Sequence, residues 1–374
     1  MKTRGAIITE VPGRLHVAEL ELAPPQQGEV LVKMVASGLC HSDLHYTTGD
    51  MEVGTIPMLC GHEGSGIIEE IGPDTQSDLE VGDHVIFSFI TACGKCEFCA
   101  RGMQNLCHLG ALMLHGSTLE DVERYRFSMP DGTRCGQIAG LGTFAEHTVV
   151  SVGSCVKVDK ELPLDVLCLL GCGVGTGWGS AVNSAEIEIG ETVIIAGIGG
   201  VGINAVQGAV SAGATNIIAV DPVPFKLDEA KKIGATHTAE SIEAAAEIAA
   251  SLTNGQGADK AVITIGVVKG EHVAAAFNAI RKAGTVVVTG VASFADTDGI
   301  PVSLAELTLF QKRIQGSLFG GASPNYAIPR QVDLFRHGQL KLEELITHRY
   351  TLDEVQQGYD DMEAGKNLRG IVVF

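Results

Sequence analysis

The stretch CHSDLH, over residues 40–45, places a thiol, a hydroxyl and two imidazoles within six residues. A single thiolate does not make a metal site, so Cys40 needs partners from elsewhere in the chain. His62, in the motif GHEG, and Cys172, in the motif GCG, are the candidate partners. Two sulfurs and an imidazole fill three positions of a tetrahedral zinc and leave the fourth open, which is the pattern of a catalytic zinc. The three residues therefore predict a catalytic zinc site.

Each of these residues also has a plainer interpretation. Free cysteines are often small buried apolar residues, so Cys40 and Cys172 could simply pack in a core. His62 could be a buried histidine with its hydrogen bonds satisfied. The zinc hypothesis depends on the three occurring together, beside the nucleotide motif described below.

A second group of cysteines has the spacing of a closed metal site. The motif CGKCEFC and one later cysteine leave two, two and seven residues between successive thiols. Four thiolates fill a tetrahedral zinc and leave no place for substrate, so this ion would fold a loop. An iron–sulfur cluster or free thiols are the alternatives, although ferredoxin-type runs have other spacings. The predicted ligands of this structural zinc are Cys93, Cys96, Cys99 and Cys107.

A glycine-rich motif predicts a dinucleotide site. GIGGVG follows the apolar run 192–196 and opens a helical pattern that continues to about residue 212. Glycines here let the backbone turn tightly and approach a pyrophosphate, whose charge suits the N–H groups of a helix N-terminus. Asp221, 19 positions after the last glycine, suits ribose hydroxyls and repels a 2′-phosphate, so NAD is favoured over NADP. The residues predicted to contact the dinucleotide are Gly197, Gly199, Gly200, Val201, Gly202 and Asp221. The alternative for Asp221 is that it is only a loop residue with no role in binding.

Length and charge narrow the class of protein. A chain of 374 residues is long enough for two domains, and 26 basic against 45 acidic residues argue against nucleic acid or an anionic membrane as a partner. No apolar run approaches the roughly 20 residues of a membrane span, and the first residues lack a signal-peptide pattern. Ten cysteines, mostly at ligand-like spacings, favour zinc over disulfides. We expect a cytoplasmic protein.

The order of the patterns predicts an α/β protein with a β domain first. Short alternating segments punctuated by glycine run to about residue 158, which is typical of a small barrel. From about residue 192 strand patterns alternate with helical ones, which predicts a doubly wound parallel sheet. The last segments, two helices and a strand over 370–374, suggest that the chain returns to the first domain. Residues 108–141 carry charges and a turn, and we expect a surface excursion near the mouth of the active site.

Together the motifs resemble the zinc-dependent medium-chain alcohol dehydrogenases along essentially the whole chain. The resemblance rests on CHSDLH, GHEGSG, CGKCEFC with Cys107, LLGCGVGTGWGSAV, GIGGVG and the terminal KNLRGIVVF. It implies a GroES-like β-barrel catalytic domain over 1–173 and 317–374. It also implies a Rossmann coenzyme domain over 174–316. Two zinc ions per subunit and NAD are the implied cofactors, and a homodimer or homotetramer is the implied assembly.

The resemblance also implies roles for residues around the predicted metal and cofactor. Asp43 would orient the ligand His62, and Glu63 would approach the metal during ligand exchange. Ser42 and His45 would pass the alcohol's proton through the cofactor ribose to solvent, and Phe89 would face the substrate. The implied cofactor contacts are His41, Thr176, Asp221, Lys226 and Arg369.

The implied reaction is the reversible oxidation of a primary alcohol to an aldehyde, with hydride transfer from a zinc-bound alkoxide to nicotinamide. LGTFAEHTVV, QGAVSAGA, DPVPFK and LFGGASPNY resemble the actinobacterial nicotinoprotein branch, which retains NAD and reduces a second acceptor such as nitrosodimethylaniline (NDMA). An ordinary dehydrogenase with exchangeable NAD is the alternative. A glutathione-dependent formaldehyde dehydrogenase is disfavoured. Those enzymes have an arginine just after the fourth structural cysteine that binds the carboxylate of the thiol adduct, whereas this chain has HLGA at 108–111. A non-catalytic nucleotide-binding protein is the remaining alternative.

His41 departs from the family pattern. Many members have an arginine there that contacts the pyrophosphate, so a histidine could make cofactor affinity sensitive to pH.

Overall fold

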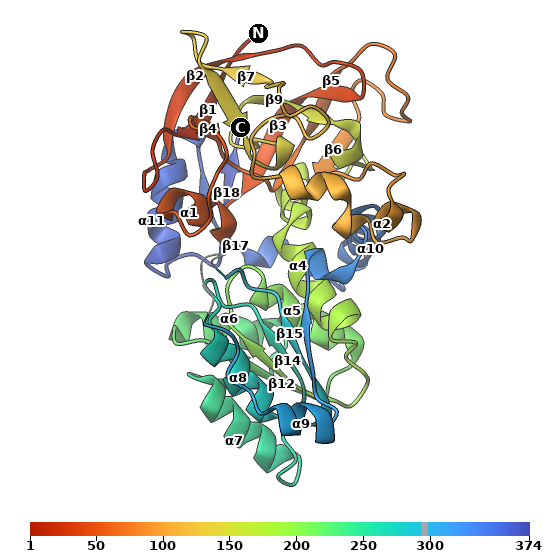
Figure 1. The fold of residues 1–374 in the computed structure, drawn as a ribbon, viewed down its shortest axis with the longest axis vertical. Coiled ribbons are helices and arrows are strands. Elements are labelled where there is room, and N and C mark those ends of the chain that lie inside the picture. Colours follow the sequence, from red (N-terminus) through yellow and green to blue (C-terminus); the bar gives the residue numbers. More distant parts are fainter. Residues whose placement is uncertain (293–297) are drawn as a thin grey trace. The chain divides into compact units, whose positions relative to one another are not determined.

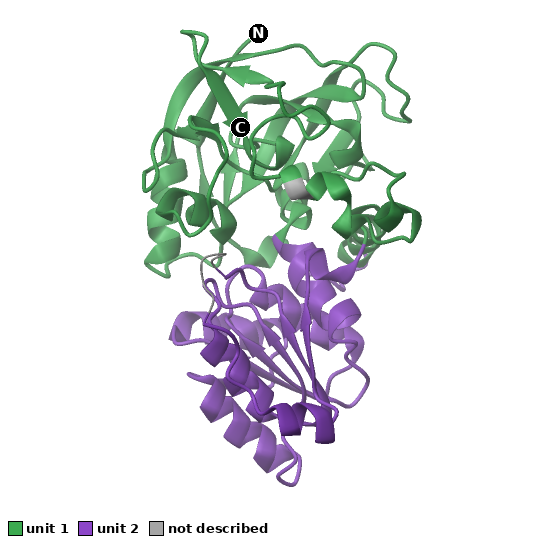
Figure 2. Cartoon of the chain, in the orientation of Figure 1, with its two compact units in different colours: residues 1–172, 323–336, 342–374 green, residues 173–322, 337–341 purple. Residues whose placement is uncertain are grey.

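The computed structural model describes residues 1–292 and 298–374, and it divides them into two compact units (Figure 2). Unit 1 comprises Met1–Cys172, Ser323–Arg336 and Leu342–Phe374. Unit 2 comprises Gly173–Ala322 and His337–Lys341. The sequence placed residues 173, 317–322 and 337–341 in the first domain, whereas the structure groups them with unit 2.

Unit 1 contains the β-barrel that the sequence predicts. The strands of the closed barrel, in order, are β1 (Lys2–Ile8), β2 (His16–Leu22), β7 (Phe127–Ser128), β8 (Arg134–Gln137) and β4 (Met58–Leu59). A seven-stranded sheet accompanies it, formed by β10 (Cys155–Val158), β6 (His84–Phe87), β5 (Gly64–Ile71), β3 (Glu29–Gly38), β18 (Arg369–Val373) and β17 (Ile346–Tyr350), with β9 (His147–Ser151) on β3. The helices of unit 1 are α1 (His41–Thr48), α2 (Glu97–Ala100), α3 (Leu164–Leu167), α10 (Pro324–Arg336) and α11 (Val355–Glu363).

Strand β3 is the centre of unit 1, because both of its faces are buried. Val30, Val32 and Met34 point into one apolar cluster, whereas Leu31 belongs to another. This division follows from the two-residue period of a strand, which sends successive side chains to opposite faces. β3 pairs with β5 and β9 along its length and with β18 near its end. The C-terminal strand therefore does return to the first unit, as the sequence suggests.

The expectation of a surface excursion over residues 108–141 was wrong for 126–128 and 135–141, although residues 120–123 and 130–134 are exposed. This segment supplies barrel strands β7 and β8, and Phe127 and Cys135 lie in a core cluster with β1 and β2. The predicted turn is present, since the amide of Gly132 donates to the carbonyl of Met129 at 2.9 Å. The error came from charged residues, which usually indicate surface, but here Arg126 is only 2% exposed.

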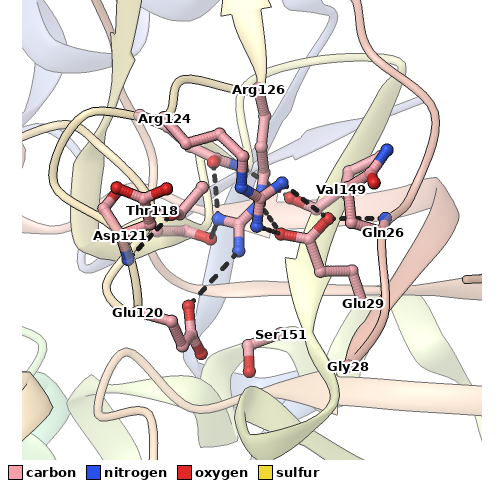
Figure 3. Close-up of polar contacts among 12 residues, drawn as sticks. Gln26, Gly28, Glu29, Thr118, Glu120, Asp121, Arg124, Arg126, Val149 and Ser151 are labelled. Carbon is pink, nitrogen blue, oxygen red and sulfur yellow. Dashed lines mark hydrogen bonds and ion pairs between the residues drawn. The ribbon is translucent and has the colours of Figure 1, made fainter. Parts of the chain in front are cut away.

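Arg126 is buried because Glu29 of β3 neutralises it (Figure 3). Glu29 is 2% exposed and accepts from Nε of Arg126 at 2.8 Å and from Nη1 of Arg124 at 3.1 Å. Nη1 of Arg126 donates to the side chain of Gln137 at 2.9 Å and to the carbonyl of Gly140 at 3.1 Å. A buried charge is tolerated when it is paired and hydrogen-bonded, so this cluster fixes residues 124–140 against β3.

Unit 2 is the doubly wound α/β domain that the sequence predicts (Figure 1). In the described residues its sheet is parallel, in the order β13 (His237–Ala239), β12 (Asn216–Val220), β11 (Thr192–Ala196), β14 (Ala258–Ile263), β15 (Ile280–Val288) and β16 (Arg313–Gly316). Its helices are α4 (Gly173–Gly179), α5 (Gly202–Ala212), α6 (Pro224–Ile233), α7 (Ile242–Leu252), α8 (Gly270–Ala279) and α9 (Leu304–Leu309). Ile194 and Ala196 of β11 pack with α7 and α8, while the intervening Val193 and Ile195 are also fully buried. Burial of both strand faces is typical of a parallel sheet between helix layers.

Within the described part of the chain, no single helix has the length and hydropathy to cross a membrane. A bent pair over 164–171 and 173–184 passes that test by length and composition alone.

Substituting Glu29 with glutamine tests the buried ion cluster. Glu29→Gln leaves Arg126 buried without its countercharge, so we expect a loss of about 3 kcal/mol in the free energy of unfolding at pH 7. Burial alone would raise the pKa of Glu29, but Arg124 and Arg126 hold it below its ordinary value. The stabilisation should therefore be complete above the unfolded pKa of about 4.3 and be lost as pH falls through the lower folded value. Urea unfolding between pH 3 and 7 measures both effects.

Glu19→Gln is the matched control, because Glu19 pairs with Lys2 at 2.6 Å on the exposed surface. An exposed pair contributes only about 0–1 kcal/mol. Equal losses in the two variants would contradict the role given to Glu29.

Candidate functional site

Cys40, His62 and Cys172 come together in unit 1. One ligand atom from each lies within 4.8 Å of the other two, and all three residues are buried. Cys40 is the N-cap of α1, two residues after the end of β3, and His62 lies two residues before β5. Cys172 is the last residue of unit 1 before α4. The chain therefore gathers three soft or borderline ligands from three separate segments at one buried point, which is a donor set suited to zinc.

The charges around this point favour a cation. Asp43 Oδ2 lies 3.0 Å from Nδ1 of His62, and Asp43 Oδ1 accepts from the amide of Gly61 at 2.8 Å. Burial alone would lower the pKa of His62, yet Asp43 and Cys40 raise it well above its usual value. The hydrogen bond with Cys172 lowers the pKa of Cys40 well below its usual value and raises that of Cys172 well above it. The site thus holds negative charge in a buried place, and Asp43 occupies Nδ1 of His62, which leaves Nε2 for a ligand.

Glu63 and Arg369 form a buried ion pair in unit 1. They are 0% and 3% exposed, and Nη2 of Arg369 donates to Oε2 of Glu63. A Cβ at Gly38 would lie 1.9 Å from that oxygen, so the absence of a side chain at Gly38 makes room for the pair. Burial alone would lower the pKa of Arg369, but Glu63 and Cys40 raise it. Arg369, which was expected to contact a pyrophosphate, therefore pairs in this structure with Glu63, which was expected to approach the metal.

The other predicted catalytic side chains lie on or near α1. Ser42 Oγ is 3.6 Å from Sγ of Cys40. His45 is 3% exposed, and its ring centroid is 5.2 Å from that of the exposed His41. The half-buried Phe89 meets the ring of His62 edge-on, with 5.7 Å between centroids. Asp50, which the sequence did not indicate, also lies beside His45, with 3.2 Å between its Oδ2 and Nδ1 of the ring.

Cys93, Cys96, Cys99 and Cys107 form the second group whose ligand atoms lie within 4.8 Å of one another. The amides of Cys93 and Cys96 donate to sulfurs of the group, each at 3.3 Å. Gly94 and Gly102 adopt φ of +73° and +78°, so the loop uses two left-handed turns that favour glycine. Backbone N–H groups of the loop lower the pKa of Cys96 to about 6. Four sulfurs with amide donors fit a tetrahedral zinc with no open position.

The remaining cysteines are free thiols. Burial raises the pKa of Cys135 and of Cys155 to about 12, so both stay protonated and unreactive at neutral pH. Cys60 and Cys168 are fully buried in unit 1. These positions agree with packing roles.

In unit 2 the glycine-rich motif connects β11 to α5. Gly197 has φ of +93°, and a Cβ at Gly202 would lie 1.8 Å from the carbonyl of Gly197. The two glycines therefore permit the tight turn. By contrast, a Cβ at Gly199 would meet nothing within 4 Å, so the backbone there borders open space. A turn that leaves bare backbone beside a helix N-terminus fits a pyrophosphate.

Asp221 follows β12 and is tied to this motif. Its Oδ2 accepts from the amide of Ile198 at 2.8 Å and its Oδ1 from that of Val223 at 2.9 Å, while Nζ of Lys226 lies 3.8 Å away. The carboxylate is thereby held at the end of the strand beside the glycine turn. Oγ1 of Thr176, on α4, is buried without a hydrogen-bond partner in the described residues, so it could still bond to a ligand.

Comparisons with known proteins agree over the whole chain. Residues 26–160 match the alcohol dehydrogenase GroES-like domain, and residues 200–335 match the zinc-binding dehydrogenase family. An NDMA-dependent alcohol dehydrogenase of Amycolatopsis methanolica is 47% identical over 373 residues, which cover 100% of this chain and 99% of that protein.

Solved structures show the same relationship. A zinc-binding-domain alcohol dehydrogenase from Burkholderia ambifaria has a TM-score of 0.92 at 30% identity, and benzyl alcohol dehydrogenase from Acinetobacter calcoaceticus has 0.87 at 31%. Each comparison covers 100% of this chain and 99% of the other. With both family models and a full-length relative in agreement, the chain belongs to the zinc-dependent medium-chain alcohol dehydrogenases, and it is an oxidoreductase that uses zinc and NAD.

Proposed function

We propose that this protein oxidises primary alcohols to aldehydes reversibly and keeps its NAD bound while a second acceptor removes the reducing equivalents. The observation that carries the alcohol chemistry is the buried meeting of Cys40, His62 and Cys172. Three ligands leave one position of a zinc for the alcohol oxygen. In this proposal unit 1 is the catalytic domain and unit 2 is the coenzyme domain.

Cys40, His62 and Cys172 would hold the catalytic zinc, and the four clustered cysteines would hold the structural one. The catalytic ion, when bound, supplies a Lewis acid that favours the ionised alcohol. Asp43, whose Oδ2 lies 3.0 Å from Nδ1 of His62, would keep a proton on that nitrogen and leave Nε2 as the metal ligand. Glu63 is paired with Arg369, so its carboxylate would reach the metal only after this ion pair opens.

Ser42 and His45 would remove the alcohol's proton. Ser42 Oγ, 3.6 Å from Sγ of Cys40, lies beside the position expected for the reacting oxygen. It would accept the proton, and His45 would pass it toward solvent. The carbon gives up its hydride and the oxygen its proton, so the alcohol becomes an aldehyde.

NAD, when bound, supplies the hydride acceptor. In this proposal the turn formed by Gly197, Gly199 and Gly202 holds its pyrophosphate, and Asp221 with Lys226 holds the adenosine ribose. Further contacts would come from Gly200, Val201, His41, Thr176 and Arg369.

Retention of NAD is the finer part of the proposal. It is supported by the full-length similarity to a protein described as NDMA-dependent. The alternative is an enzyme with exchangeable NAD. Phe89 beside His62 supplies an apolar surface near the metal and favours an alcohol with an apolar carbon chain or ring. We further propose a cytoplasmic location, since ten cysteines without a disulfide suit a reducing compartment. A homodimer or homotetramer is proposed from the family resemblance alone.

Replacing a ligand of the catalytic group tests the central assignment. We expect Cys40→Ser to lower kcat for alcohol oxidation by more than about 100-fold, because even outer-sphere changes at zinc sites cost ~10–100-fold. Metal analysis should show loss of one zinc per subunit. Cys155→Ser, which alters a thiol outside both groups, should retain activity and zinc. Full activity in Cys40→Ser would refute the site.

The four-cysteine group predicts a stability effect rather than a chemical one. Cys93→Ser should also remove one zinc per subunit, and it should lower the unfolding temperature because metal binding is coupled to folding of the loop. Metal analysis and calorimetry measure these changes, with Cys155→Ser as control. Retention of both ions would contradict the ligand assignment.

The bound cofactor can be counted directly. Denaturing the purified, extensively dialysed protein should release about one NAD or NADH per subunit if the cofactor is retained. Chromatography of the supernatant gives the number. An empty supernatant, together with turnover that requires added NAD, would support the exchangeable alternative.

A further inference from the structure

His45 is buried, yet its ring contacts an exposed carboxylate. The imidazole is 3% exposed, whereas the side chain of Asp50 is 43% exposed. Oδ2 of Asp50 lies 3.2 Å from Nδ1 of His45. A buried imidazole cannot deliver a proton to bulk water by itself, and this exposed carboxylate gives the ring one connection to solvent.

The end of α1 places Asp50 against His45. Gly49 adopts a left-handed conformation with φ of 87° and ends the helix. The amides of Gly49 and Met51 both donate to the carbonyl of His45, at 3.1 and 3.2 Å, so the chain folds back over its last turn. The side chain of residue 50 thereby returns to the ring five positions earlier.

Thr48 holds the carboxylate in that position. Its Oγ1 donates to Oδ2 of Asp50 at 2.7 Å, which is the same oxygen that meets His45. The hydrogen bond from Thr48, followed by that from His45, keeps the pKa of Asp50 below its usual value. An ionised carboxylate accepts only, so it selects the His45 tautomer with the proton on Nδ1, in which Nε2 is the unprotonated nitrogen that can accept one.

We propose that Asp50 is a positioning residue for His45 and the exposed end of its proton route, an inference that rests on the proposed relay from Ser42. A proton that arrives at Nε2 of His45 is balanced by loss of the Nδ1 proton to Oδ2 of Asp50. Water or a buffer base then takes it from the exposed carboxylic acid. No electrons move in these steps.

Two other interpretations compete with this one. The ring of His41 also faces His45, at 5.2 Å and with an angle of 58° between planes, and it is exposed, so it offers another exit. Asp50 could also act only as a local support for the end of α1. The first predicts that removal of Asp50 leaves turnover unchanged, and the second predicts a loss that small bases cannot restore.

Chemical rescue of the zinc- and NAD-loaded enzyme separates these possibilities. Asp50→Ala should lower kcat for alcohol oxidation by about 10-fold or more, with little change in the alcohol KM. Added formate should raise the rate of this variant in proportion to its concentration, because it replaces the missing carboxylate. Asp50→Glu should recover part of the rate. Glu52→Gln, which removes an exposed carboxylate two residues away, should behave like the wild type and show no response to formate.

A second readout does not depend on turnover. In ¹⁵N-histidine NMR spectra, wild-type His45 should carry its proton on Nδ1, and Asp50→Ala should shift it toward Nε2. The His45 signal is assigned by its loss in His45→Asn. An unchanged tautomer in Asp50→Ala would overturn the positioning role, and unchanged turnover or a rate that formate does not raise would overturn the proton route. Absence of alcohol turnover in the wild type would refute the proposed function and, with it, the proton route through Asp50. The tautomer of His45 would still decide whether Asp50 positions the ring.

Discussion

Two thiols and an imidazole, buried with their ligand atoms within 4.8 Å of one another, form a ready donor set for one metal ion. Burial of an ionised group without a partner costs several kcal/mol, and proteins avoid it by pairing or by metal coordination. Asp43 adds a further buried carboxylate to the same place. The electrostatics of unit 1 therefore favour a cation at this point, and the residues that follow β3, precede β5 and precede α4 are arranged around it.

Similar reasoning accounts for the other buried charges of unit 1. Glu29 with Arg126, and Glu63 with Arg369, are ion pairs between segments that are distant in the chain. Breaking either pair would leave a buried charge without its partner, whereas an apolar replacement of equal volume would avoid the desolvation cost. Their effect is to define which strand meets which segment. The second pair also restrains Glu63, the neighbour in sequence of His62, within unit 1.

Local sequence patterns were sufficient for most elements of unit 2. Strand β11 and helix α5 have the predicted bounds, because an apolar strand and a helix that follows a glycine-rich turn are determined by neighbouring residues. The segment 108–141 was misread for the opposite reason. Whether Arg126 is exposed depends on Glu29, which lies 97 positions away in the chain, and no local pattern contains that information.

The sequence by itself determined the types and spacing of the ligands, the four-cysteine loop, the glycine turn with Asp221, and the barrel and doubly wound classes of the two units. These follow from the chemistry of each residue and from periodicity over short windows. Only the tertiary structure decided that Arg369 pairs with Glu63, that Arg126 is buried, and that Asp50 reaches His45. Each of these contacts is set by how the backbone turns back on itself or by which distant segment supplies the countercharge, and such properties belong to the folded chain as a whole.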